Sequence, residues 1–147
     1  MSQYINFYFK TKNDTFISVG DFSRSTKMYE VCREVGAPWE QLEPFTKKRR
    51  EQVLNGLLYR KCKARNRILE LESELKDSHI FKGLSLEDRV TWREELKFEI
   101  KQWKEKISEL DYGINFVTII GEMREGHENQ LYFGFEVEGA LENLKNN

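Results

Sequence analysis

A pair of heptad repeats in the middle of the chain constrains the fold more than any other feature. Positions recur with alternating steps of three and four residues, the pattern of helices that pack as a coiled coil. The first repeat comprises Leu54, Leu57, Lys61, Ala64, Ile68, Leu71 and Leu75, and the second comprises Leu96, Ile100, Trp103, Ile107 and Leu110. Only the short segment 77–83 separates the two predicted helices. The sequence therefore predicts two long antiparallel helices within residues 46–111.

The segments on either side of this helical hairpin have the alternation and composition of β-strands. Tyr4–Phe9 alternates apolar and polar residues, and Thr15–Val19 follows after a turn, which predicts a first hairpin. Ile114–Met123 and Leu131–Val137 are rich in β-branched and aromatic residues around a turn at Glu125–Asn129, which predicts a second hairpin. Because an isolated hairpin is marginally stable in water, we expect both to join into one four-stranded antiparallel sheet.

A short amphipathic helix is predicted between the first hairpin and the long helices. Ser23 or Ser25 can cap its start, and Gly36 can end it in a left-handed conformation. Its apolar stripe comprises Met28, Val31, Cys32 and Val35. The prediction is thus an α+β protein of one domain, with a head formed by residues 1–45 and 112–147 and a helical arm formed by residues 46–111. In an alternative arrangement, each hairpin pairs with another copy of the chain.

The first predicted long helix concentrates positive charge in a chain whose formal net charge is -1. Residues 46–67 hold nine basic side chains and a single acid, Glu51. Lys61 lies on the heptad seam, where it can extend outward to solvent or set the register of the helix pair. The other eight are the candidate partner-binding residues: Lys47, Lys48, Arg49, Arg50, Arg60, Lys63, Arg65 and Arg67.

Neither pairing within the chain nor helix stability explains this excess of cations. The segment that should face it, residues 93–111, carries six acids against five bases and neutralises little. Cations in the first turn of a helix are also disfavoured by the helix dipole. We therefore predict a non-enzymatic binding protein whose basic arm docks on an acidic protein surface or on nucleic acid. Small binders of this kind are typical of phages and mobile elements that inhibit host machinery.

Two alternatives stay open. A second stripe, Leu58, Cys62 and Leu69, lies beside the heptad seam and needs cover from the short helix or from another subunit. The chain could therefore be a self-assembling structural subunit, a homo-oligomer in which the charges form contacts between copies. It could also sequester a small anionic ligand such as a nucleotide, held by the basic helix and nearby aromatic residues.

The sequence offers no support for catalysis, a metal or a cofactor. The only histidines are His79 and His127, and neither lies in a recognisable catalytic motif. Glu125, His127 and Glu128 could approach a cation, but their spacing is not that of a zinc site. We therefore expect no enzymatic activity, no catalytic residues, no bound metal and no cofactor.

The chain also lacks the features of a membrane or secreted protein. No apolar stretch is long enough to span a bilayer, and the first residues do not resemble a secretory signal. Cys32 and Cys62 form no CxxC pair and are interpreted as buried thiols of a reducing compartment. We expect a soluble cytoplasmic protein without membrane contact.

Overall fold

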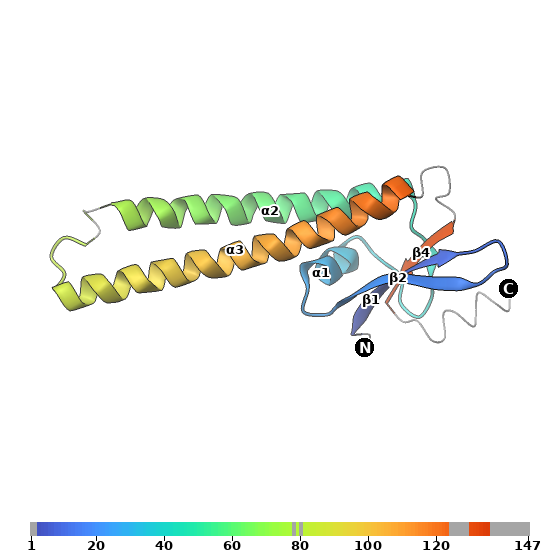
Figure 1. Cartoon of the computed structure of the whole chain (residues 1–147), viewed down its shortest axis with the longest axis horizontal. Coiled ribbons are helices and arrows are strands. Elements are labelled where there is room, and N and C mark those ends of the chain that lie inside the picture. The colour runs from blue at the N-terminus through green and yellow to red at the C-terminus, as the bar shows by residue number, and fades with distance from the viewer. Residues whose placement is uncertain (1–2, 78, 80, 124–129, 136–147) are drawn as a thin grey trace. The chain divides into compact units, whose positions relative to one another are not determined.

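The computed structural model describes residues 3–77, 79, 81–123 and 130–135. These residues form three helices and four strands, and the two long helices pack side by side (Figure 1). In chain order the elements are β1 (Tyr4–Lys10), β2 (Phe16–Ser23), α1 (Lys27–Glu34), β3 (Glu43–Pro44), α2 (Lys47–Lys76), α3 (Leu86–Met123) and β4 (Leu131–Gly134). The chain divides into a first compact unit, Met1–Leu57 with Tyr112–Asn147, and a second, Leu58–Asp111. Both long helices take part in both units.

The strands of the first unit form one four-stranded antiparallel sheet, in the order β2-β1-β4-β3. β1 is central: it pairs with β2 from Tyr4 opposite Ser23 onward, and its Phe7 pairs with Phe133 of β4. Alternate residues of β1, Ile5 and Phe7, are buried, as the alternation in the sequence indicates. The predicted α+β fold with a four-stranded antiparallel sheet and a long helical hairpin is therefore confirmed.

The prediction of a second hairpin is wrong in its first strand. Residues 114–123 are helical, and α3 continues through them to Met123. Their β-branched residues also fit a helical period, because Val117 and Ile120 are three apart and both are buried. Phe116 packs against rings of β1 and β2, so burial against the sheet outweighs the strand propensity of this segment.

The fourth strand comes instead from the segment that precedes α2. β3, Glu43–Pro44, pairs with the outer edge of β4, where a proline is tolerated because its missing N–H faces away from the ladder. β4 lies within the predicted last strand. The predicted turn at 125–129 and the strand residues 136–137 lie outside the described residues.

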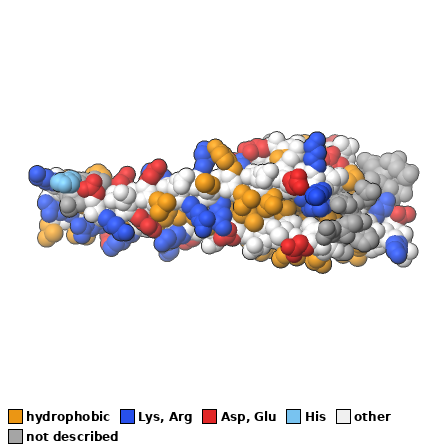
Figure 2. All heavy atoms as spheres, turned by 90° about the horizontal axis from the view of Figure 1, so that it is seen from above, with side chains coloured by type: hydrophobic (Ala, Val, Ile, Leu, Met, Phe, Trp, Pro, Cys, Tyr) orange, Lys and Arg blue, Asp and Glu red, His pale blue; other side chains and the backbone are white. Residues whose placement is uncertain are grey.

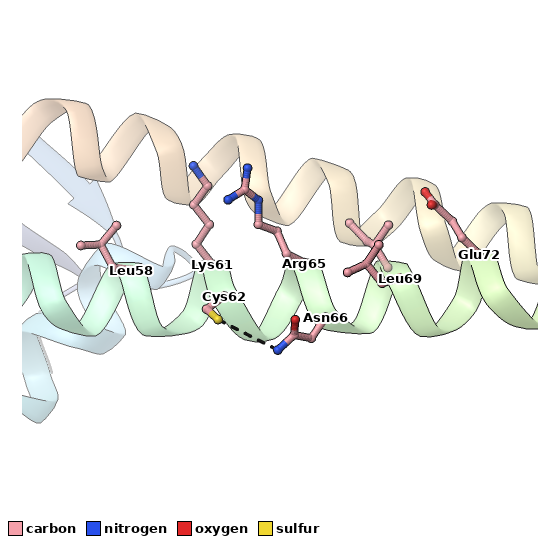
Figure 3. Close-up of a pocket in the computed structure, with 8 residues that line it drawn as sticks. Leu58, Lys61, Cys62, Arg65, Asn66, Leu69 and Glu72 are labelled. Atoms are coloured by element: carbon pink, nitrogen blue, oxygen red, sulfur yellow. Dashed lines mark hydrogen bonds between the residues drawn. The ribbon is translucent and has the colours of Figure 1, made fainter.

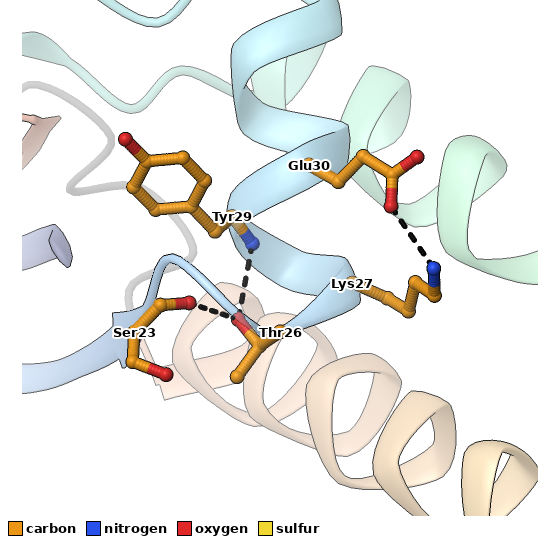
Figure 4. A network of polar contacts seen from close by, with 5 residues as sticks. All are labelled: Ser23, Thr26, Lys27, Tyr29 and Glu30. Atoms are coloured by element: carbon orange, nitrogen blue, oxygen red, sulfur yellow. Dashed lines mark hydrogen bonds and ion pairs between the residues drawn. The ribbon is translucent and has the colours of Figure 1, made fainter. Parts of the chain in front are cut away.

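Helix α1 begins one residue after its cap, Thr26, which corrects the expectation that Ser23 or Ser25 caps it. The Thr26 hydroxyl accepts a hydrogen bond from the Tyr29 amide at 3.3 Å and donates to the Ser23 carbonyl at 2.7 Å (Figure 4). Thr26 is extended, with φ -88° and ψ 156°, the conformation that an N-cap requires. The two serine hydroxyls instead lie 2.9 Å from each other.

The other end and the buried face of α1 agree with the sequence. Gly36 has a φ of 82°, a left-handed conformation in which glycine is favoured, and it terminates the helix as predicted. Met28, Val31 and Cys32 of the predicted stripe are buried. They attach α1 to the rest of the first unit.

Close packing of α1 on α2 requires a glycine within α2. A Cβ atom at Gly56 would lie 2.7 Å from Cγ1 of Val31, which is closer than side-chain atoms pack. We expect Gly56→Ala to lower the free energy of unfolding by about 1–3 kcal/mol through overpacking. This result would oppose the intrinsic helix preference of alanine over glycine, about 1 kcal/mol.

Urea unfolding followed by circular dichroism measures this change. Asn55→Ala is the matched control, because Asn55 is the exposed neighbour in the same helix and its replacement should be neutral or slightly stabilising. If both variants were equally stable, the close approach of α1 to α2 would be refuted.

The second unit is a helical hairpin with its own core. The core comprises Ile68, Leu71, Phe81, Leu96 and Ile100, with Leu75, Leu84, Trp103 and Ile107 packed against it. The predicted heptad seam is thus the interface between α2 and α3. Lys61, the one charged residue on this seam, is half-buried and forms an ion pair with Asp111 at 2.6 Å. Ser85 caps α3, because its hydroxyl accepts the Asp88 amide hydrogen at 3.1 Å.

Within the part of the chain that the structure describes, no helix is both long and apolar enough to cross a membrane.

Candidate interaction surface on the second helix

The predicted partner-binding residues all lie on α2, in two groups. Lys47, Lys48, Arg49 and Arg50 form the first turn of the helix and belong to the first unit. Arg60, Lys63, Arg65 and Arg67 follow within the second unit. The two groups differ in what their charges contact, and each is described by itself.

The two arginines of the first group attach the start of α2 to the chain that precedes it. Arg49 forms an ion pair with Glu43 at 2.9 Å and donates a hydrogen bond to the carbonyl oxygen of Val35. Oε1 of Glu43 is buried and has no hydrogen-bond partner among the described residues, so charge attraction rather than a directed hydrogen bond holds this pair. Arg50 donates to the Phe45 carbonyl at 3.3 Å. Both guanidinium groups therefore have structural contacts.

The two lysines of the first group are exposed and have no ion pair among the described residues. Lys47 and Arg50 line a groove of about 290 Å³, but the carboxylates of Glu51 and Glu122 line it too. Opposite charges in equal number make this groove a poor site for an anion.

In the second group, Arg67 and Arg60 are engaged within the chain. Arg67 forms ion pairs with Glu70 at 3.1 Å and with Glu99 of α3 at 3.3 Å. The hydrogen bonds to Glu70 and Glu99 raise the pKa of the Arg67 guanidinium further. Arg60 also has an interaction within the chain. These two charges, like Arg49, are therefore not free of intramolecular contacts, although the sequence suggested a surplus of uncompensated cations.

Lys63 and Arg65 keep their charges exposed. The Lys63 ammonium lies 5.0 Å from the centre of the Tyr59 ring, a cation–π contact that leaves its net charge unbalanced. Arg65 is exposed and forms no ion pair within the residues described by the structure. These two side chains are the strongest candidates for contact with an anionic partner.

Arg65 lies in a groove of about 600 Å³ that follows one face of α2, which we name the α2 groove (Figure 3). It is lined by Leu58, Lys61, Cys62, Arg65, Asn66, Ile68, Leu69 and Glu72. The side chains of Leu58 and Leu69 are 44% and 63% exposed. The stripe that the sequence identified as needing cover, Leu58, Cys62 and Leu69, is therefore exposed.

The cysteines differ from the expectation that both are buried. Both are free thiols, but Cys62 is exposed in the α2 groove, where Asn66 Nδ2 lies 4.0 Å from its sulfur. The sequence placed Cys62 on an apolar stripe, and the spacing of apolar residues in a stripe is the same whether the stripe is exposed or buried. Cys32 is buried, and burial raises the pKa of its thiol far above the ordinary value.

Charge along the α2 groove changes sign from one end to the other. Arg65 lies at the middle of the groove and Glu72 at its end, while the charge of Lys61 is balanced by Asp111. On the face shown in Figure 2, Lys and Arg side chains are interspersed with Asp and Glu and with apolar groups. The surface is therefore mixed in character rather than uniformly basic.

Sequence reasoning missed Asn66 and Glu72 as parts of this surface. A signal was present: Leu58, Cys62, Arg65, Leu69 and Glu72 recur with steps of four and three, the spacing of one helix face. Counting charges singled out the basic residues of α2 and overlooked Glu72, an acid on the same face of the helix.

Of the two histidines, the structure describes only His79. His79 is exposed, and its backbone amide donates to Asp77 at 2.9 Å. His127, Glu125 and Glu128 lie outside the described residues. Elsewhere in the described chain, no cluster of three or more His, Cys, Asp or Glu side chains could hold a metal ion.

Comparison with protein-family models, curated proteins and solved structures finds no significant match to this chain.

Proposed function

We propose that the chain is a non-enzymatic binding protein that docks its α2 groove on an acidic surface of a partner protein. The observation that carries the proposal is the exposed guanidinium of Arg65, which lies between exposed apolar side chains and has no carboxylate partner in the described residues. Lys63, on the same helix, adds a second unbalanced charge.

An acidic protein fits this surface better than nucleic acid does. Binding to a phosphate backbone depends on the number of cations that displace counterions and does not require apolar contact. Protein interfaces instead combine buried apolar anchors with a few charged groups, and arginine is enriched in them. The α2 groove offers Leu58 and Leu69 as such apolar anchors beside Arg65.

The apolar and charged groups would act together on binding. Burial of Leu58 and Leu69 removes apolar surface from water and supplies affinity. It also excludes water around Arg65, where a facing carboxylate would form a charge-assisted hydrogen bond. The unbalanced charges of Lys63 and Arg65 would speed the encounter with an acidic surface and select against basic ones.

Some finer expectations from the sequence stay predictions. They are the inhibition of host machinery by a phage or mobile-element protein, a cytoplasmic location, and capture of a small anionic ligand such as a nucleotide. Inhibition and ligand capture are tested by identifying the partner or ligand, and location is tested by localising the protein in its native cell.

Affinity capture from native cell extract, with and without nuclease, tests the proposal. The bait is compared with Lys63→Glu/Arg65→Glu and with a control of equal charge change, Lys47→Glu/Lys48→Glu, in the other group. We expect an acidic protein whose recovery is independent of nuclease and falls about tenfold or more with the first variant only. Recovery that nuclease abolishes, or that both variants reduce equally, would point to nucleic acid or to nonspecific charge and would refute the proposal.

A further inference from the structure

The α2 groove carries opposite charges that cannot satisfy each other within one chain. Arg65 and Glu72 both line it, and neither has an ion pair among the described residues. They are seven residues apart on the same helix, which corresponds to about 10.5 Å along the axis. That separation is too long for a direct pair, so both charges are hydrated in the single chain and are available to a group from outside the groove.

A second copy of the same groove supplies both groups. When two identical helices lie antiparallel across a two-fold axis, the first half of each faces the second half of the other. With the axis close to Leu69, Arg65 of each copy lies opposite Glu72 of the other. The two Leu69 side chains, each 63% exposed in the single chain, then meet at the centre.

We propose that two copies of this chain associate through the α2 groove, with α2 antiparallel to α2, two Arg65–Glu72 ion pairs and a Leu69–Leu69 contact at the axis. The inference deepens the proposed function, because it names a second occupant of the same groove and makes self-association compete with the acidic partner. A partner must displace the second copy before it reaches Arg65.

The rest of the groove is compatible with this arrangement. In Figure 3, Cys62 and Asn66 point away from α3, whereas Lys61, Arg65 and Glu72 extend toward it. Arg65 is exposed and Glu72 is half-buried, so both charges remain accessible. Lys61 lies at the border of the groove, where its pairing with Asp111 lowers the repulsion that it would exert on the other copy. The paired segment from Arg65 to Glu72 is only about two turns of helix, roughly 10.5 Å long, and Leu58 lies beyond it, which places the contact among small and reversible interfaces.

Sedimentation velocity of the full chain tests the inference, over a concentration series at low salt. We expect the mass of the wild-type chain to rise from one copy toward two as the concentration increases. Arg65→Glu and Glu72→Arg alone each place like charges opposite one another and should weaken association about tenfold or more. An equimolar mixture of the two variants should restore association. In a pair made of one copy of each variant, both contacts between positions 65 and 72 join opposite charges.

The mixture also controls for folding, since a misfolded variant could not regain association. A wild-type chain that stays monomeric throughout, single variants that associate like wild type, or a mixture no stronger than its components would each overturn the inference.

The failure of this inference is distinguishable from failure of the proposed function. Suppose that the chain is monomeric and that Lys63→Glu/Arg65→Glu abolishes its capture of an acidic protein. The proposed function would then stand, and the α2 groove would be the binding site for that protein. If the chain is a dimer and these substitutions leave its capture of proteins unchanged, the inference of self-association would stand and the proposed function would be refuted.

Discussion

Phe7→Ala is expected to remove a large share of the stability of the first unit. Phe7 is fully buried, and its ring packs 5.1 Å from Phe45, 5.1 Å from Phe116 and 6.0 Å from Phe133, measured between ring centres. The removal of a buried phenyl ring leaves a cavity and typically destabilises by about 3–5 kcal/mol. Because small domains are stable by only about 5–15 kcal/mol, this is a large share of the total.

Urea unfolding monitored by circular dichroism and tryptophan fluorescence measures the loss. Ile17→Ala, in the neighbouring strand β2, is the control, because Ile17 is half exposed and its truncation should change stability by well under the Phe7 value, about 1 kcal/mol or less. Equal losses in the two variants would mean that the aromatic cluster around Phe7 is not the core of this unit.

The second large effect is expected at Leu71, in the core of the helical hairpin. Leu71 is completely buried among Ile68, Leu96 and Ile100. Its replacement by alanine should lower the free energy of unfolding by about 2–5 kcal/mol. The loss should appear as an earlier unfolding transition of helical structure, followed by circular dichroism at increasing temperature or denaturant.

Leu69 provides a matched control two residues away, because it has the same side chain as Leu71 but is exposed to solvent. Because it is 63% exposed, Leu69→Ala should change stability by about 0.5 kcal/mol or less. The same variant should weaken self-association in sedimentation velocity, whereas its folding remains intact. A Leu69 variant as unstable as the Leu71 variant would show that the α2 groove is covered in the native protein and is not a docking surface.

The helical hairpin was predictable because its signal is local and redundant. Ile68, Leu71 and Leu96 belong to repeats in which each apolar position supports the same helical period. The presence of a four-stranded sheet was predictable for a similar reason, because the alternation of residues in β1 and β4 leaves one buried face. Residues 114–123 were mispredicted because β-branched and aromatic residues fit either a strand or a buried helix, and only packing against the sheet distinguishes the two.

The candidate site was predictable only in part. The count of charges in residues 46–67 directed attention to α2, where the α2 groove lies. It could not separate Arg65 from Arg67, two residues of the same type and nearly the same position. Arg67 is paired with Glu99, which is thirty-two residues away in sequence, so its compensation depends on the packing of α3 against α2.

By itself, the sequence determined the helical period of the long segments, the central strand and the concentration of charge on one helix, because these depend on neighbours within a few residues. Which of those charges remain available, and which apolar stripe stays exposed, became known from the folded chain alone. The physical reason is that ion pairing and burial depend on distances between side chains brought together by folding, and a linear pattern does not contain those distances.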